Sequence, residues 1–344
     1  MEGSGSPRIA RGDLLAFLAL VVLAAALFQD ALLGGRAFFE RDVFAVWLSQ
    51  IEAFRRAVRS GVWPVWDESV SFGQPLLANP NAQALYPTTW LALALPAWTT
   101  YSLHVLVHLL FGGLGAYALA RRLLVAREAA AAAALLWVAC GPLLSLVNVW
   151  HHLAGAAWMP WVLLGAEATI AGRRARTAVA WGLALAMQVL AGSPDFCVMT
   201  WVAVGARMLV VLIGSRQRWR VLPPAALASV VGLGLSAPQW LATLDAVSRA
   251  DPFWRERGMR ILWALHPASL AQVLLPVRFD ALAAGSSAEA ALRLSDVWSP
   301  FLRSFHVGVV TLALVAVGVA AGRRRHALFL AALAAFALLY ALGP

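Results

Sequence analysis

Two carboxylates that could act in acid–base chemistry open the segment that follows the first apolar run. Glu40 and Asp42 flank Arg41 there. A carboxylate can accept the proton of a hydroxyl group, alone or while it binds a divalent cation. The structural alternative for Asp42 is the N-cap of the next helix, a position where aspartate is strongly preferred. The alternative for Glu40 is a solvated charge near the helix start.

Three arginines follow on a segment with helical periodicity. Apolar residues recur at spacings of three and four between Val43 and Val58, and the opposite face carries Arg55, Arg56 and Arg59. A helix of this kind is expected to lie in the membrane interface. The guanidinium fork suits phosphate oxygens, and the alternative role of the three arginines is contact with lipid headgroups.

Two short turns further along the chain carry other candidate polar residues. His151 and His152 could contact a phosphate or ligate a metal ion, and the alternative is an interfacial turn beside Trp150. Asp195 follows a Gly-Ser-Pro sequence, so it is either a second acidic site residue or a turn former.

Ionisable residues also fall within apolar runs, which is a functional signal in a membrane protein. His104 and His108 are one helical turn apart, and without a third ligand they predict hydrogen bonds between helices rather than a metal site. Glu167 lies near the end of an apolar run, where snorkelling to the surface would explain it. Cys140 and Cys197 are expected to be two separate thiols, with a disulfide as the alternative.

The composition of the chain indicates a membrane protein. Of its 344 residues, 61% are hydrophobic and 13% are charged, and the mean hydropathy is +0.74. Soluble domains are about half apolar. The net charge of +10 does not indicate nucleic-acid binding, because the basic residues, all of them arginine, form short clusters between apolar runs.

The sequence predicts an all-α polytopic membrane protein of about nine spans, since a span needs about 20 mostly apolar residues. The predicted spans are 14–33, 101–120, 129–147, 153–170, 177–191, 198–213, 222–244, 305–321 and 327–342. The first is expected to be an uncleaved helix rather than a signal peptide, because further spans follow it.

Arginine clusters predict the orientation of these spans. They occupy every second connection, near residues 8–11, 121–127, 173–176, 216–220 and 323–325, whereas the short turns at 148–152 and 192–196 carry none. The positive-inside rule therefore predicts a cytoplasmic N-terminus and two long outer loops, at about 34–100 and 245–304. We expect a single transmembrane domain, residues 1–344. Its end at an apolar run predicts an N-terminal portion of a longer protein.

The first outer loop has more pattern than a connector needs. Its motifs are Trp63-Pro64-Val65-Trp66-Asp67, Gly73-Gln74-Pro75-Leu76-Leu77-Ala78-Asn79-Pro80-Asn81 and Tyr86-Pro87-Thr88-Thr89-Trp90. They predict an ordered loop, and the apolar run at 91–97 after them is too short to span a membrane.

Together with Phe38 to Asp42 and three later motifs, this order of residues resembles the YfhO-like family of bacterial membrane proteins, which is similar to GT-C glycosyltransferases. The later motifs are Ala120-Arg121-Arg122, Trp158-Met159-Pro160-Trp161 and Ala191-Gly192-Ser193-Pro194. The resemblance covers most of the chain up to about the sixth predicted span.

The resemblance implies an enzyme of the bacterial cytoplasmic membrane that transfers a sugar, on the outer face, from a polyprenyl-phosphate carrier to a glycan or lipid acceptor of the cell envelope. GT-C enzymes generally place an acidic residue just past helix one, which matches Asp42, with Glu40 as its companion. A divalent cation, Mg²⁺ or Mn²⁺, is an expected cofactor at Asp42. The expected substrate contacts are Arg41, Arg55, Arg56, Arg59, His151, His152 and Asp195.

This chain departs from the family's pattern at two of these turns. The family commonly has a glutamine where this chain has Asp195, and a single histidine where it has His151 and His152. A later outer segment, Asp251-Pro252-Phe253-Trp254-Arg255-Glu256-Arg257, could contact the acceptor, and a solvated amphipathic stretch is the alternative.

Two other classes of function stay open. A transporter or flippase of lipid-linked material is the first rival, although no internal repeat of the kind common in transporters is visible. A non-catalytic membrane scaffold is the second. A cytoplasmic nucleotide-sugar enzyme is not expected, because the sequence has no Walker or dinucleotide-binding motif.

Overall fold

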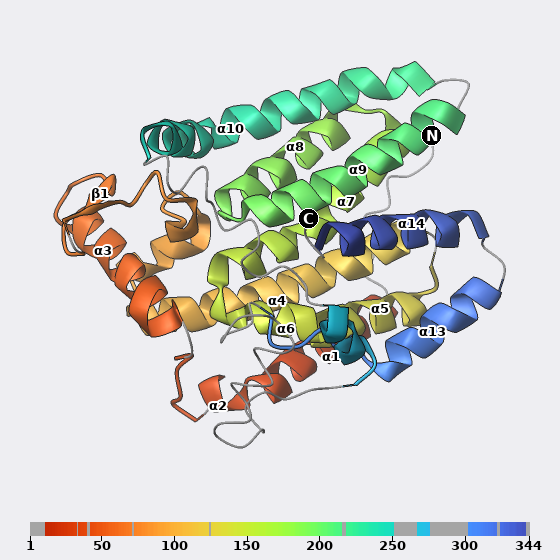
Figure 1. Ribbon diagram of the computed structural model, residues 1–344, viewed down its shortest axis with the longest axis horizontal. Helices are drawn as coiled ribbons and strands as arrows, with labels where there is room; N and C mark the ends of the chain where they lie inside the picture. Colours follow the sequence, from red (N-terminus) through yellow and green to blue (C-terminus); the bar gives the residue numbers. More distant parts are fainter. Residues whose placement is uncertain are drawn as a thin grey trace. The chain divides into compact units, whose positions relative to one another are not determined.

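The computed structural model describes residues 11–32, 34–39, 42–70, 72–123, 125–214, 218–250, 267–275, 302–321 and 324–341. Over these residues the chain is almost entirely helical, with one two-stranded hairpin, which confirms the prediction of a helical fold class. The chain divides into two compact units, and Figure 1 labels most of their helices. Unit 1 is Met1–Val138 with Asn148–Thr243, and unit 2 is Ala139–Val147 with Leu244–Pro344.

Unit 1 carries the candidate residues. Its helices are α1 (Arg11–Leu27), α2 (Gln29–Leu32), η1 (Val43–Trp47), α3 (Leu48–Arg59), η2 (Pro80–Ala82), η3 (Pro87–Leu93), α4 (Ala97–Arg122), α5 (Arg127–Ala139), α7 (Trp150–Gly172), α8 (Ala175–Leu190), α9 (Pro194–Gly214), η5 (Arg218–Val221) and α10 (Leu222–Arg249). The last residues of α5 and of α10 belong to unit 2. Strands β1 (Trp66–Asp67) and β2 (Gln74–Pro75) pair antiparallel in the first loop.

Within the described part of the chain, five helical stretches are long and apolar enough to cross a membrane. They are Ala97–Arg122, Arg127–Asn148, Trp150–Gly172, Pro194–Gly214 and Trp219–Arg249. The helices at the other four predicted positions do not meet the same length and hydropathy together. The membrane class is therefore supported, and the count of nine spans stays a prediction.

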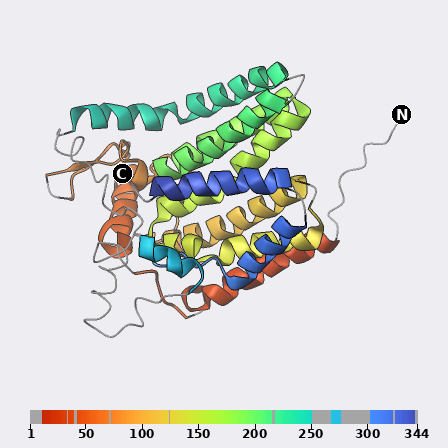
Figure 2. The same cartoon turned by 45° about the vertical axis from the view of Figure 1, so that its right-hand side comes forward.

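The first loop and the arginine clusters of unit 1 lie at opposite ends of its helices (Figure 2). At the arginine end, Tyr117 of α4 donates a hydrogen bond to Asp13 of α1, at 2.5 Å, and Arg127 lies 3.3 Å from the same carboxylate. At the loop end, the indole of Trp150 donates to the Asn81 carbonyl, at 2.9 Å. This separation agrees with the alternation of arginines in the sequence.

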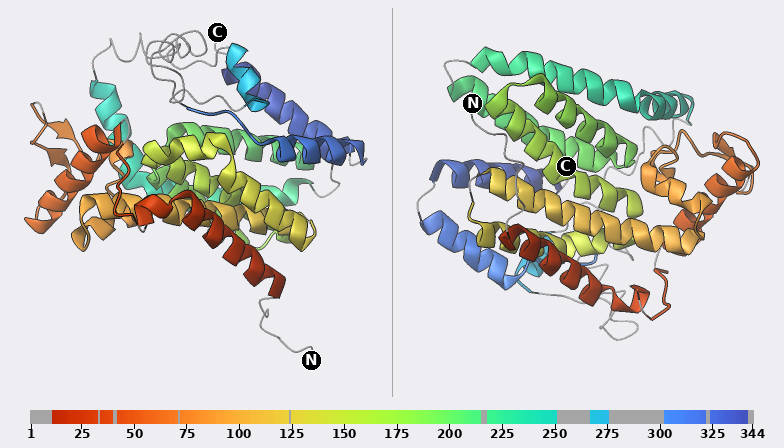
Figure 3. Two further views of the ribbon diagram at one scale, coloured as in Figure 1. Left: turned by 90° about the horizontal axis from the view of Figure 1, so that it is seen from below. Right: turned by 180° about the vertical axis from the view of Figure 1, so that it is seen from behind.

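Small residues let the central helices approach each other closely. α7 packs along both α4 and α8 (Figure 3). A Cβ at Gly112 of α4 would lie 3.2 Å from the Cα of Ala157, and a Cβ at Gly165 of α7 would lie 2.9 Å from the Cβ of Trp181. Close contact through small residues is how helices associate in lipid, where no hydrophobic force drives them together. α4, α7 and α8 thus form the frame that positions the loop.

The apolar stripe of α3 includes side chains that the protein itself buries, and the position of this helix in the membrane interface stays a prediction. Ile51 and Phe54 are 0% and 1% exposed. The Phe54 ring packs edge-on against Trp90 of η3, with ring centroids 5.2 Å apart. Hydrophobic periodicity shows that a helix has a face to bury. It does not show whether lipid or a returning loop buries that face.

Unit 2 contains α6 (Gly141–Ser145), η4 (Leu146–Asn148, whose last residue belongs to unit 1), η6 (Pro267–Val273), α13 (Val309–Ala320) and α14 (Arg324–Ala341). The α6 turn is held by two bonds: the Gly141 amide donates to the His306 carbonyl, at 2.8 Å, and the Ser304 amide donates to the Ser145 hydroxyl, at 3.1 Å. The stretch from Asp251 to Arg257, an expected acceptor contact, lies outside the described residues.

Candidate functional site

The Pro-rich part of the first loop is inserted among the helix ends of unit 1. Four side chains bond backbone carbonyls across this junction: Gln83 to Ala191 at 2.6 Å, Trp150 to Asn81, Gln239 to Leu77, and Thr243 to Ala78, the last three at 2.9 Å. Since helices α7 and α10 and the α8–α9 turn all take part, the loop is a fixed element rather than a connector.

Glycine is required where this loop meets the α8–α9 turn. Gly192 has a φ of +79°, and a Cβ there would collide with the carbonyl oxygen of Pro80. A residue with a side chain is strained in the left-handed region, and here it would also displace the loop. The backbone geometry thus explains the glycine of the Ala-Gly-Ser-Pro motif.

Asp42 stands at the N-cap position of η1, but its side chain makes no capping hydrogen bond. The residue is half-buried. Its charge acts on the phenol of Tyr101, at the start of α4. Trp47, at the other end of η1, donates from its indole to the carbonyl of Asn148, at 2.9 Å, and so ties η1 to the end of η4, just before α7. The structural alternative for Asp42, a side-chain cap, is not realised.

The three arginines of α3 have partners within the protein. Arg55 contacts Glu52 at 3.3 Å, while its Nε is buried without a hydrogen-bond partner. Arg59 donates to the Leu93 carbonyl, at 2.7 Å. Arg56 donates to the hydroxyl of Ser69, at 2.9 Å. Arg55 is therefore the one of the three with a buried donor that has no hydrogen-bond partner among the described residues.

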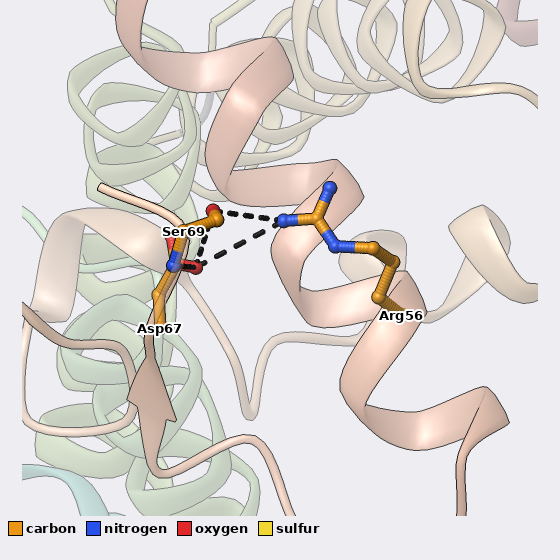
Figure 4. Close-up of polar contacts among 3 residues, drawn as sticks. All are labelled: Arg56, Asp67 and Ser69. Atoms are coloured by element: carbon orange, nitrogen blue, oxygen red, sulfur yellow. Dashed lines mark hydrogen bonds and ion pairs between the residues drawn. The ribbon is translucent and has the colours of Figure 1, made fainter. Parts of the chain in front are cut away.

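Asp67 is a buried carboxylate whose role the sequence did not predict, because it stood out only as the last residue of the Trp63–Asp67 motif. It is 5% exposed. Its Oδ1 accepts from the amide and the hydroxyl of Ser69, at 3.0 and 2.6 Å, and lies 3.9 Å from Arg56 (Figure 4). Burying a charge is costly unless it is paired. The contact with Arg56 therefore joins the β1–β2 hairpin to α3.

Tyr86, His104 and His108 form a closed hydrogen-bond network between the loop and the bundle. Carbonyl oxygens only accept, so His104 Nε2 donates to Trp150 O, at 3.0 Å, and His108 Nδ1 donates to His104 O, at 2.6 Å. In the neutral imidazoles the other nitrogen must accept. Thr88 then donates to His104 Nδ1, at 2.8 Å, and Tyr86 donates to His108 Nε2, at 2.6 Å.

One bond of this network joins two helices, as predicted: His104 of α4 bonds the Trp150 carbonyl of α7, whereas His108 bonds within α4 and to Tyr86 of the loop. The Tyr86 oxygen also accepts from the indole of Trp158, at 2.7 Å. Burial raises the pKa of Tyr86. Every ring nitrogen and the phenol have partners when all three groups are neutral, so the network holds the loop in place. The sequence did not predict the role of Tyr86, because its partners His108 and Trp158 are far from it in the chain.

His151, His152 and Asp195 meet at the loop end of α7 and α9. His152 Nδ1 is 2.5 Å from the hydroxyl of Ser193, and its Nε2 is 3.9 Å from Asp195 Oδ2. The rings of His151 and His152 are 4.2 Å apart, and His151 packs edge-on against Trp47. His151 Nδ1 is buried without a hydrogen-bond partner. These three expected site residues are brought together.

Glu167 does not snorkel; it pairs with Arg207 of α9, which sequence reasoning did not consider. Arg207 Nε lies 2.5 Å from Glu167 Oε1, and Arg207 Nη2 lies 3.1 Å from Oε2. The side chains are 17% and 33% exposed. The sequence did contain a signal for this pair, because Arg207 lies inside a predicted span. An arginine there is costly without a partner.

Glu40 and Arg41 lie outside the described residues. Among the described residues, no group of three or more His, Cys, Asp or Glu side chains could hold a metal ion. A hard cation at Asp42 would fit its carboxylate oxygen and would take its other ligands from water and substrate phosphate, as Mg²⁺ commonly does. Cys140 and Cys197 are both free thiols, as expected.

Neither the family models, nor the curated proteins, nor the solved structures contain a match to this chain.

Proposed function

We propose that the chain is an integral membrane glycosyltransferase of GT-C type, which transfers a sugar from a polyprenyl-phosphate donor to a cell-envelope acceptor at the loop end of unit 1. The observation that carries the proposal is the placement of Asp42. Asp42 is half-buried, its side chain makes no capping bond, and it stands at the start of η1, which Trp47 ties to the end of η4. This is the support that a positioned acid–base group needs.

In this proposal Asp42 accepts the proton of the acceptor hydroxyl as the oxygen attacks the anomeric carbon. The bond to the carrier phosphate breaks, and the phosphate leaves with the bonding electrons. A cation must face that developing charge. Arg55 is the candidate among the three, because its Nε is buried without a hydrogen-bond partner within the described residues, and a bound anion would satisfy it. Mg²⁺ or Mn²⁺ at Asp42, when bound, would supply further positive charge.

The proposal places the loop end on the outer face of a bacterial cytoplasmic membrane, with the N-terminus in the cytoplasm. The support is that the arginine clusters of the short connections lie at the other end of the unit 1 helices, while arginines within a long loop carry little weight for orientation. Glu40 and Arg41 belong to the proposed site by sequence position alone.

The test uses the full chain in proteoliposomes with labelled polyprenyl-phosphate sugars and a cell-envelope extract, with and without Mg²⁺ or Mn²⁺. Asp42→Asn is expected to lower transfer by about 10²–10⁴-fold, the usual contribution of general base catalysis. Asp30→Asn is the matched control, because Asp30 is an exposed carboxylate paired with Arg36 outside the site. Equal transfer by Asp42→Asn and the wild type would refute the assignment.

A transporter remains the rival, and one observation bears on it. Transport paths use ionisable groups inside the membrane, and Glu167, Arg207, His104 and His108 are such groups. Each of them has a hydrogen-bond partner within the protein. Uptake or flipping of lipid-linked sugar by the same proteoliposomes, without transfer, would favour the rival.

A further inference from the structure

Large apolar side chains are exposed on the β1–β2 hairpin and on the turn that leads into it. We call six of them the hairpin patch: Val62, Trp63, Val65, Trp66, Val70 and Phe72. Trp63 and Trp66 are about half exposed, and Phe72 is fully exposed. Exposed apolar residues gathered in this way mark a surface that contacts a membrane or another protein.

Two arginines of α3 lie beside the hairpin patch. Arg56 donates from Nη2 to the Ser69 hydroxyl, at 2.9 Å, and the same nitrogen is 3.9 Å from Asp67 (Figure 4). The Arg56 side chain is still 53% exposed. Arg59 is also exposed and donates from Nη2 to the Leu93 carbonyl. Because a guanidinium has five N–H donors, both arginines can bind an anion while they keep these contacts.

The length of α4 indicates the depth at which these residues lie. Trp98 and Arg121 stand at its two ends, about 35 Å apart at 1.5 Å per residue. This is a little more than the thickness of a hydrocarbon core, about 30 Å. Trp98 is exposed, and tryptophan is enriched at the boundary between lipid and water. Arg59 bonds Leu93 just before α4 begins, so it lies near that boundary.

The length of α10 leads to the same depth. Gln239 and Thr243 bond the carbonyls of Leu77 and Ala78, which follow β2 directly. The two side chains stand about 26 and 32 Å along the helix from Leu222, where α10 begins at the arginine end. The hairpin is therefore joined to α10 near the far boundary of a hydrocarbon core.

We propose that the hairpin patch, together with Arg56 and Arg59, binds the anionic phospholipid headgroups of the leaflet at the loop end. The indoles and valines enter the layer between headgroups and acyl chains, where amphipathic rings are at ease. The guanidinium groups bond the phosphate oxygens. Glu68, an exposed carboxylate of the same hairpin, stays in water. The inference needs a membrane protein but not the transfer of a sugar.

Charge argues against a second copy of the chain as the occupant of this surface. A symmetric contact brings the same patch of both copies together. The arginines of one copy would then face those of the other, and like charges across an interface are costly. A layer of anionic headgroups complements the apolar and the cationic residues alike.

The first test measures depth. Phe72→Cys, in a full chain whose Cys140 and Cys197 are replaced by alanine, is labelled with the fluorophore NBD. The chain is placed in nanodiscs of phosphatidylcholine and phosphatidylglycerol without glycolipid. A spin label on the lipid headgroup should quench the probe more strongly than a spin label near the end of the acyl chain. Val230→Cys, an exposed position inside the apolar stretch of α10, is the matched control and should show the opposite order.

Three results would overturn the proposal. Quenching of the Phe72→Cys probe by iodide, but by neither lipid label, would place the surface in water. Quenching by none of the three would show that protein covers it. Stronger quenching by the acyl-chain label would place it below the headgroups.

The second test measures the contribution of charge. Emission of the same probe is followed as the fraction of phosphatidylglycerol is raised. The fraction that gives half of the emission change should be about five-fold higher in Arg59→Gln, the contribution of one arginine near an anionic surface. Arg59→Gln is preferred to Arg56→Gln, because loss of Arg56 would leave the buried Asp67 without its cation.

Arg36→Gln is the matched control for charge, because Arg36 is an exposed arginine outside the patch, paired with Asp30. It should respond to phosphatidylglycerol like the wild type. An equal response in Arg59→Gln and the wild type would overturn the headgroup contact. Neither test contains a sugar donor, so a chain that binds headgroups here but transfers no sugar would contradict the enzyme alone.

Discussion

The ion pair between Glu167 and Arg207 should be a major contributor to the stability of unit 1. Glu167→Gln leaves the Arg207 guanidinium inside an apolar helix, with one neutral partner in place of a carboxylate. An unpaired arginine at a helix centre costs about 2.5–3.5 kcal/mol on insertion scales, and breaking a buried pair costs about 3–5 kcal/mol. Because the Arg207 side chain is 33% exposed, we expect a loss of about 2–3 kcal/mol in the free energy of unfolding.

The assay is reversible unfolding of the purified chain in mixed micelles, with the double variant Glu167→Gln/Arg207→Gln completing a mutant cycle. The double variant should lose less than the sum of the single variants, because it leaves no unpaired charge. Arg249→Gln is the matched control: it breaks an exposed pair with Asp245 and should cost less than about 0.5 kcal/mol. If Glu167→Gln costs no more than this control, or if the two single effects add, the reasoning is wrong.

Three further predictions concern the loop and the orientation of the chain. Gly192→Ala should lower the thermal midpoint, since it strains a positive φ and displaces the loop, whereas Gly205→Ala, with open space around its Cα, should not. Burial raises the pKa of Tyr86, so the folded state keeps the phenolic proton above pH 10.0 after the unfolded state has lost it. Stability should therefore fall above that pH, and Tyr86→Phe should remove this part of the decline. In a cysteine-free background, Glu68→Cys should react with an impermeant maleimide added outside spheroplasts, and Arg174→Cys only after lysis; the reverse pattern would contradict the predicted orientation.

The rival functions differ in what they require of the described residues. A glycosyltransferase needs groups that meet a substrate at one end of the bundle, and Asp42, His152 and Asp195 lie at that end. A transporter needs groups that change partners across the membrane. Tyr86, His104 and His108 are instead joined in a network whose donors and acceptors are matched. This difference favours the enzyme.

Local patterns in the sequence were enough to predict several features of this protein. Long apolar runs predicted a helical membrane protein, because a span must satisfy its own backbone hydrogen bonds. The arginine alternation predicted which helix ends lie together. The spacing of His104 and His108 predicted hydrogen bonds between helices. These features depend on residues close together in the chain, so the sequence alone could reveal them.

Only the tertiary structure decided which distant residues meet. Phe54 of α3 packs against Trp90 of η3, Arg56 lies 3.9 Å from Asp67, and Glu167 pairs with Arg207. It likewise set His152 between Ser193 and Asp195. The periodicity of a segment indicates which of its side chains must be buried or paired. Their partners depend on packing between segments that are far apart in sequence. The sequence could therefore indicate where the candidate site lies, but not which contacts its residues make.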